Sequence, residues 1–271
     1  MKKHLSTILL ILVFFVGLSV MLYPGVSDYW NSFHQSRAIV DYDAVYQNMS
    51  IDDSQEAFAA AEAYNEQIRQ IPFPLMNYDQ AAGYEELLNI GGTGIMGYIE
   101  IEKIGVELPV YHGTSDGVLN VAVGHVQGTS LPTGGPDTHC VFSAHRGLPS
   151  ARLFSDLDKL ELGDTFVLTV LNRRMTYLVD QILIVEPFEV DALYVTEGKD
   201  YCTLVTCTPY GINSHRILVR GVRTDNAEAP REVRVTADAR QIRPLLVAPV
   251  LAVPLLLILL VVLMVEQRRK K

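Results

Sequence analysis

Residues 200–223 place a thiol and a guanidinium where two strands should end side by side. Cys207 follows the run 201–206, which is rich in β-branched and aromatic residues and is typical of a strand. A Pro-Tyr-Gly turn breaks that run, and the alternation over 216–222 predicts a second strand that begins at Arg216. A thiol attacks only as the thiolate, and the pKa of a free cysteine is about 8.5, so a reactive cysteine needs cations nearby. The pattern therefore suits a nucleophilic cysteine, although a buried Cys207 and an Arg216 in a surface ion pair fit it equally well.

A cysteine nucleophile also needs a proton carrier, and the chain has seven histidines. His4 and His34 lie on either side of the first apolar segment and are poor candidates. The remaining candidates are His112, His125, His139, His145 and His215. His145 is favoured because it follows an apolar strand and opens a loop, a strand-end position like that of Cys207. For His125 and His215 a hydrogen-bonded structural histidine is the simpler interpretation.

The strings around these residues resemble those of one family. Thr203-Leu-Val-Thr-Cys207, with an arginine nine positions after the cysteine, resembles the signature of the sortases, membrane-anchored cysteine transpeptidases of Gram-positive surfaces. The longer string from Thr206 to Arg216 is similar to the pilus-assembling branch, class C. Further class C-like blocks follow one another within residues 84–223: Gly97-Tyr-Ile-Glu-Ile, Leu108-Pro-Val-Tyr-His-Gly113, Gly124-His125, Thr129-Ser-Leu-Pro-Thr-Gly-Gly135, Ser143-Ala-His-Arg-Gly-Leu-Pro149 and Leu153-Phe-Ser-Asp-Leu157.

The resemblance implies a catalytic role for Cys207, for His145 and for Arg216. Cys207 would attack the threonine carbonyl of a Leu-Pro-x-Thr-Gly-like motif and hold the substrate as a thioester. His145 would protonate the departing amine and deprotonate the incoming one. Arg216 would stabilise the oxyanion. Thr206 is a candidate substrate-positioning residue, although a threonine on a strand needs no such role, and no metal or other cofactor is implied.

The resemblance also implies partners, namely pilin subunits that carry sorting motifs and acceptor lysines, joined into a pilus. A housekeeping sortase that transfers surface proteins to a peptidoglycan precursor is the rival within the enzyme class. The second apolar segment and the Thr-Pro-Tyr-Gly block favour the pilus polymerase. A membrane-tethered surface protein without catalysis is the rival from another class, and an unreactive thiol at Cys207 would indicate it.

Two uncharged stretches, 5–23 and 245–265, are each long enough to cross a bilayer as a helix. Lysines precede the first and a basic tail, 266–271, follows the second, so the positive-inside rule places both ends of the chain in the cytoplasm and the residues between them outside. An uncleaved anchor is favoured over a cleaved signal peptide for the first stretch, because no small-x-small cleavage site follows it. The second stretch and its basic tail resemble a wall-sorting signal, but no Leu-Pro-x-Thr-Gly-like motif lies directly before them. The Leu-Pro-Thr-Gly-Gly string at 131–135 lies too early in the chain to serve.

Charge and cysteine content narrow the partners further. The formal net charge is −9, and six of the 22 basic residues lie at the two ends of the chain, so the outer part is still more acidic and nucleic acid is excluded as its partner. Three cysteines argue against a disulfide framework. Cys202 and Cys207 lie five apart on one predicted strand and should point to opposite faces.

The predicted fold is mainly β, a closed eight-stranded sortase-type barrel with short helices, a helical N-terminal extension and one transmembrane helix at each end. Residues 1–4 form the cytoplasmic start, 24–92 the extension, 93–223 the barrel and 224–244 a polar tether. Strand-like runs recur at 98–101, 107–111, 139–143, 165–170, 175–185, 201–206 and 216–222, with a short helix near 150–160. The extension should hold a helix over 57–70 behind a capping box at 53–56, and a shorter one over 84–90, whereas 24–50 shows no clear structure.

A lid that covers the cysteine with an Asp-Pro-aromatic motif is common in class C sortases. The corresponding string here, Leu75-Met-Asn-Tyr-Asp79, has no Asp-Pro pair, and Tyr78 is the residue that could act as a plug. The connection from Pro187 to Asp200 joins two predicted strands and is the predicted site of substrate selectivity.

Overall fold

The computed structural model describes residues 2–224, with side chains from residue 11 onwards. The chain divides into two compact units. One includes the residues up to Ser27, and the other begins at Asp28 and contains the barrel. The predicted tether beyond residue 224, the second transmembrane helix over 245–265 and the basic tail lie outside the described residues.

The first helix, α1, spans Lys2–Gln47 and passes through Pro24 without ending. Its part from Ile11 has a window of mean hydropathy 1.7, and among the described residues it is the one helix long and apolar enough to cross a membrane. The sequence left residues 24–50 without clear structure, whereas the structure continues α1 as far as Gln47. Tyr42 explains part of this continuation, because its buried hydroxyl donates to Met96 O at 2.8 Å and accepts from the Leu171 amide.

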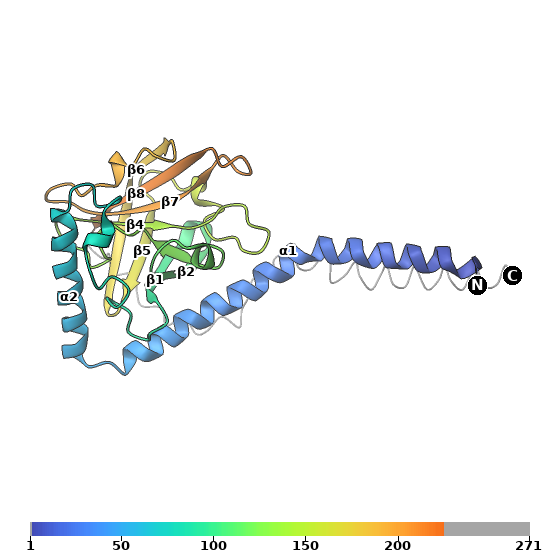
Figure 1. Cartoon of the computed structure of the whole chain (residues 1–271), viewed down its shortest axis with the longest axis horizontal. Coiled ribbons are helices and arrows are strands. Elements are labelled where there is room, and N and C mark those ends of the chain that lie inside the picture. Colours follow the sequence, from blue (N-terminus) through green and yellow to red (C-terminus); the bar gives the residue numbers. More distant parts are fainter. Residues whose placement is uncertain (1, 225–271) are drawn as a thin grey trace. The chain divides into compact units, whose positions relative to one another are not determined.

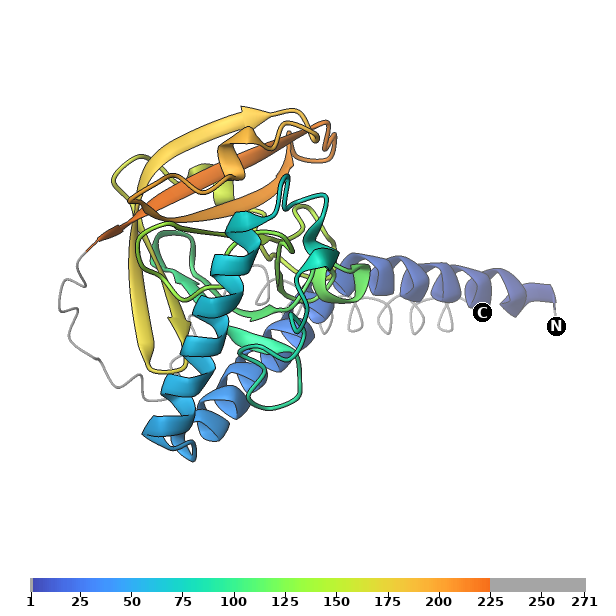
Figure 2. The same cartoon turned by 60° about the vertical axis from the view of Figure 1, so that its left-hand side comes forward.

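The second helix, α2, spans Ile51–Gln70 and ends where Pro72 could no longer continue it. Its N-cap is Ser50, whose hydroxyl accepts from the Asp53 amide at 3.0 Å, so the predicted capping box over 53–56 lies inside the helix and is wrong. α2 lies beside the barrel (Figure 2), and its residues buried in the shared core include Phe58, Ala61, Tyr64 and Ile68.

Residues after α2 contain a 3₁₀ turn, Tyr78–Gln80, and then turns over 84–88 in place of the short helix predicted for 84–90. Asn65 on α2 ties the extension to the barrel. Its amide donates to Leu131 O and Thr133 Oγ1 and accepts from the Leu131 amide, at 2.6–3.1 Å. The Leu-Pro-Thr-Gly-Gly string at 131–135 is therefore a largely buried loop held by α2.

Eight strands close into a barrel in the order β1-β2-β3-β4-β7-β8-β6-β5 (Figure 1). They are β1 Ile95–Ile101, β2 Val106–Tyr111, β3 Val123–His125, β4 Thr138–Ser143, β5 Thr165–Val170, β6 Arg173–Val185, β7 Asp200–Thr208 and β8 His215–Thr224. Short helical segments connect them: Glu102–Ile104, α3 Asp116–Leu119, Leu157–Lys159 and Asp191–Leu193. The closed barrel and seven of its strands confirm the prediction, and β3 is the strand that the sequence did not reveal.

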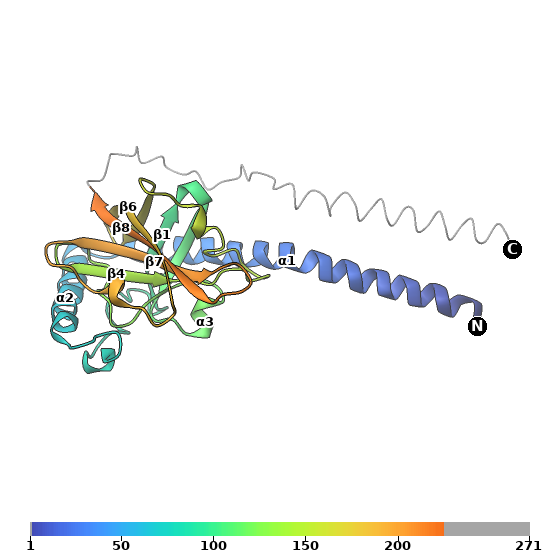
Figure 3. The ribbon, with the colours of Figure 1, turned by 90° about the horizontal axis from the view of Figure 1, so that it is seen from above.

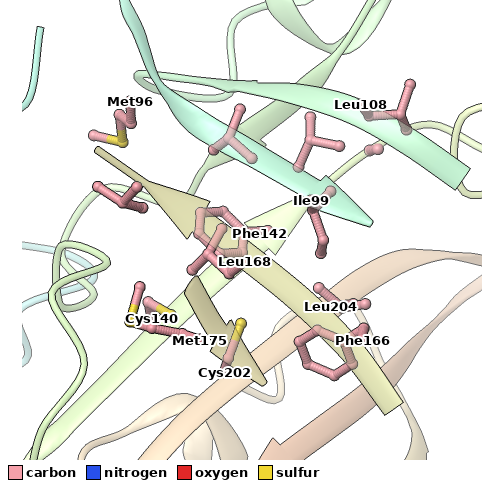
Figure 4. Close-up of a cluster of buried hydrophobic side chains, with 14 of the residues drawn as sticks. Met96, Ile99, Leu108, Cys140, Phe142, Phe166, Leu168, Met175, Cys202 and Leu204 are labelled. Carbon is pink, nitrogen blue, oxygen red and sulfur yellow. The ribbon is translucent and has the colours of Figure 1, made fainter. Parts of the chain in front are cut away.

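Alternate residues of the strands fill the barrel interior (Figure 4). The side chains labelled there include Ile99 of β1, Phe142 of β4, Phe166 and Leu168 of β5, Met175 of β6, and Cys202 and Leu204 of β7, all at most 1% exposed. Full burial of a large apolar side chain stabilises a fold by about 1.5–3 kcal/mol. The packed interior therefore gives the strand ends a rigid support.

Candidate active site

β4 and β7 run parallel, so their carboxyl ends reach the same rim of the barrel (Figure 3). The last paired residues are Ser143 of β4 and Val205 of β7. The pairing continues one step further, because the Ala144 amide donates to Val205 O at 3.2 Å. With this register the next position along β4 lies beside the end of β7, and His145 therefore leaves its strand next to Cys207.

Cys207 lies directly opposite Arg216 in the antiparallel ladder of β7 and β8. Directly opposite residues project to the same face, with Cβ atoms about 4.5–5.5 Å apart. Cys202 and Leu204 are fully buried in the core, whereas Cys207 is half-buried on the outer face of the same strand. The prediction that Cys202 and Cys207 point to opposite faces agrees with this burial.

Hydrogen bonds to the rings separate the five candidate histidines. Both ring nitrogens of His112, His125 and His139 have oxygen partners, and His215 Nδ1 contacts Ser214 Oγ, at 2.7–3.0 Å. Burial lowers the pKa of His125 to about 4 and also lowers the pKa of His139, so both favour the neutral ring. His145 is half-buried, and its ring has no hydrogen-bond partner within residues 11–224. Among these rings it is the one with both nitrogens free to exchange protons with a substrate.

The guanidinium of Arg216 keeps donors available on the outer face. Its Nη1 donates to the carbonyls of Asn213 at 3.2 Å and His215 at 3.0 Å, which holds the side chain at the start of β8. The other two nitrogens have no protein partner within the described part of the chain. A fixed guanidinium with free N–H groups beside a thiol can donate to an oxyanion that forms there.

Arg146 connects the histidine loop to the end of the cysteine strand, and the sequence reasoning did not single it out. Its side chain is 7% exposed and donates to Asp158 Oδ2 at 2.6 Å and to Thr208 Oγ1 at 3.4 Å. The guanidinium also lies 5.6 Å from the centre of the Tyr210 ring. Its position directly after His145 was the available signal, but the sequence does not show which carboxylate it contacts.

Thr206 and Tyr78, the two other predicted site residues, lie in different surroundings. The Thr206 side chain is buried, and its hydroxyl donates to Ala144 O at 2.7 Å. Tyr78 is 41% exposed and lines a cavity of about 240 Å³ together with Tyr64 and Tyr84. Substrate contact by Thr206 and a plug at Tyr78 both stay predictions.

A second cavity, of about 380 Å³, opens toward the amino-terminal end of β4. Leu193 and Tyr194 from the connection between β6 and β7 line it, as do Leu75 and His139. His139 contacts Thr203 of β7, which lies four residues before Cys207, or about 13 Å along an extended strand. The connection predicted to determine selectivity thus borders the same two strands that carry the thiol and the imidazole.

Comparisons with known proteins identify the family to which this barrel belongs. The sequence profile described as the sortase domain matches residues 99–224. Sortase C1 from Streptococcus agalactiae, whose crystal structure is known, is 47% identical in sequence to this chain. The structural match covers 70% of this chain and 99% of the sortase C1 chain, with a TM-score of 0.64. Sortase C of Streptococcus pneumoniae is 42% identical over 70% of this chain and 97% of that chain, with a TM-score of 0.62.

A curated relative, sortase A of Streptococcus agalactiae, is 32% identical over 117 residues, which are 42% of this chain and 47% of that protein. This chain spans less than two thirds of the length of the curated relatives that it matches. Its fold, its profile match and its solved neighbours together place it: the chain belongs to the sortase family, on the class C side.

Proposed function

We propose that the chain is a cysteine transpeptidase in which Cys207 is the nucleophile, His145 the general acid and base, and Arg216 the oxyanion donor. The observation that carries the proposal is the meeting of these three residues at one rim of the barrel. Their strands are neighbours in the sheet order, and the ring of His145 has no other partner among the described residues. No other cysteine fits, because Cys140 and Cys202 are buried in the core.

The proposed reaction has two acyl transfers. The Cys207 thiolate attacks the threonine carbonyl of a sorting motif, and Arg216 donates to the resulting oxyanion. When the intermediate collapses, the bond to the following residue breaks, and His145 gives its proton to the departing amine. His145 then takes a proton from the incoming amine, which attacks the thioester carbonyl. The new amide bond forms, and the thiolate is released.

The acyl acceptor that we propose is a lysine amine of a pilin subunit, so that repeated cycles polymerise a pilus. The class C neighbours support this choice, and the crystal structure of Streptococcus pneumoniae sortase C is described as giving insight into the pilin substrate specificity of that protein. Transfer to a peptidoglycan precursor is the alternative. Incubation with a purified pilin and its sorting-motif donor distinguishes them, because only the polymerase yields a ladder of covalently linked pilins.

We also propose that α1 anchors the protein in the cell membrane, with the barrel outside the cell. The apolar part of α1 supports one crossing. The proposed second crossing over 245–265 would return the carboxyl end to the cytoplasm. A reporter that works only in the cytoplasm, fused after residue 271, should then be active in cells.

The nucleophile assignment is tested with a sorting-motif peptide and intact-mass analysis. Wild-type protein should gain the mass of the acyl group, Cys207→Ala should gain none, and the core variant Cys202→Ala should still gain it. An adduct on Cys207→Ala would refute the assignment. Arg216→Lys should fold normally and lose most activity, because a point charge does not reproduce the planar fork of a guanidinium. Wild-type rates in that variant would leave Arg216 with a structural role.

A further inference from the structure

One face of α1 bonds to the loop that follows β4 and to the segment that precedes β3. Asp28, Asn31 and Gln35 are spaced by three and four residues and therefore lie on one side of the helix. Asp28 Oδ1 accepts from the Arg152 amide at 3.0 Å, Asn31 Nδ2 donates to Ser150 O at 3.0 Å, and Gln35 Nε2 donates to Val121 O at 2.6 Å. We call these three side chains the α1 clamp.

All three partners of the α1 clamp are backbone groups in loops, where no helix or strand supplies hydrogen bonds. They lie 86–124 residues away along the chain. A single bond of this kind is weak at a surface, because water can replace the partner. Three bonds over about 10 Å of one rigid helix, however, fix the position of both loops together.

The clamped loop is the one that carries His145. It is closed at its base, because the Phe154 amide donates to His145 O at 3.2 Å and the Gly147 amide donates to Ser155 Oγ at 3.1 Å. Ala151, at the tip, is buried and packs with the core. A shift at the clamped tip is therefore passed to His145 and is not absorbed by a flexible linker.

The other clamped segment supports the strand that pairs with this end of β4. Val121 lies two residues before β3, and Gly124 of β3 is paired with Ser143, the last residue of β4. Gln35 thus holds the neighbour of the strand from which His145 emerges. The α1 clamp therefore contacts both the loop that follows β4 and the segment that precedes its neighbour β3.

We propose that the α1 clamp is a positioning element for His145, so that the helix after the membrane segment is part of the active-site framework and not only a tether. This inference rests on the proposed function for its catalytic consequence. The structural part, that α1 holds the loop, stands on the two hydrogen bonds of Asp28 and Asn31 alone.

The test uses the full chain in lipid nanodiscs and the substitution Asn31→Asp, which keeps the shape of the side chain and replaces its donor with an acceptor facing Ser150 O. Asp28→Ala is added in a double variant. Ser32→Ala is the matched control, because the Ser32 hydroxyl bonds back to Tyr29 O within the same helix. The readouts are kcat and KM for thioester formation with a sorting-motif peptide, the thermal midpoint, and amide hydrogen exchange of residues 146–154.

We expect kcat to fall about fivefold in Asn31→Asp and about twentyfold in the double variant, with KM within about twofold of wild type and thermal midpoints unchanged. Exchange in the loop should be about tenfold faster, and Ser32→Ala should match wild type in every readout. Wild-type kcat in the double variant overturns the proposal, as does a fall in kcat that follows a matching fall in the thermal midpoint. If wild-type protein forms no thioester, the proposed function fails, whereas the exchange data still decide whether α1 holds the loop.

Discussion

The substitution Thr206→Val tests how the end of β4 is held next to the thiol. Valine has nearly the shape of threonine but lacks the hydroxyl that donates to Ala144 O at 2.7 Å. Thr206 is 1% exposed, so water cannot replace the lost donor. A buried carbonyl without a partner costs about 1–3 kcal/mol, and we expect the free energy of unfolding to fall by about 1.5 kcal/mol. In a unit of this size the thermal midpoint would drop by about 3–6 °C.

Activity should fall as well, because Ala144 directly precedes His145. Small displacements of a catalytic group cost up to about 100-fold in rate, and we expect kcat for thioester formation to fall about tenfold with KM unchanged. Thr206→Ser is the matched control, since it keeps the hydroxyl and loses only a buried methyl. It should lose about 1 kcal/mol of stability while keeping kcat within about twofold.

Two results would refute this reasoning. If Thr206→Val works at the wild-type rate, the hydrogen bond does not position His145. If instead KM rises while kcat stays constant, Thr206 contacts the substrate directly, as the sequence analysis considered. Stopped-flow acylation with the same peptide and intact-mass detection separates these outcomes.

Three further predictions concern an ion pair, a buried histidine and the tyrosine of the possible lid. Arg146→Ala should lower the free energy of unfolding by about 2 kcal/mol, less than for a fully buried ion pair because Asp158 is 43% exposed. Arg37→Ala is the control and should leave the free energy of unfolding almost unchanged, because the ion pair of Arg37 with Asp41 is largely exposed. Denaturant titration measures both values. Burial lowers the pKa of His125 from 6.5 to about 4, so on acidification the unfolded state binds a proton at this histidine before the folded state does. The free energy of unfolding should therefore be at its full value above about pH 6.5 and fall by about 2 kcal/mol between pH 7 and pH 5. In His125→Gln this part of the pH dependence should disappear. Tyr78→Ala should raise the rate of peptide acylation if Tyr78 acts as a plug, and equal rates in mutant and wild type would dismiss the lid hypothesis.

The sequence was informative about the fold where periodicity is long and uninterrupted. The strands β7 and β8, which carry Cys207 and Arg216 near their ends, could be predicted from β-branched runs and a turn between them. β3 could not, because it has only three residues and one of them, Gly124, has no side chain to show alternation. The capping box was misplaced because Asp53 is a good N-cap residue by type, whereas the structure uses Ser50, three residues earlier.

The sequence indicated the candidate catalytic residues of the site but not the contacts that hold them in place. Cys207 and Arg216 stand out by position within one hairpin, and the resemblance identified His145 among five candidates. Arg146 and the α1 clamp contact partners 12 to 124 residues away, and the clamp's partners are backbone groups that leave no pattern in the side chains. Such contacts depend on the tertiary arrangement, so local sequence reasoning could not reach them.

Closure of the sheet also limits how a peptide substrate can be recognised. β5 pairs with β1 and completes the ring, so each of the eight strands has a neighbour on both sides. Along the described residues that pair on both sides, an extended polypeptide finds no row of unpaired backbone groups to which it could add as a strand, whereas residues 181–185 of β6 pair with β8 alone. Along the residues that pair on both sides, discrimination between one extended peptide and another must come from side chains and connecting loops, which can change during evolution without any change to the ladder that holds the thiol.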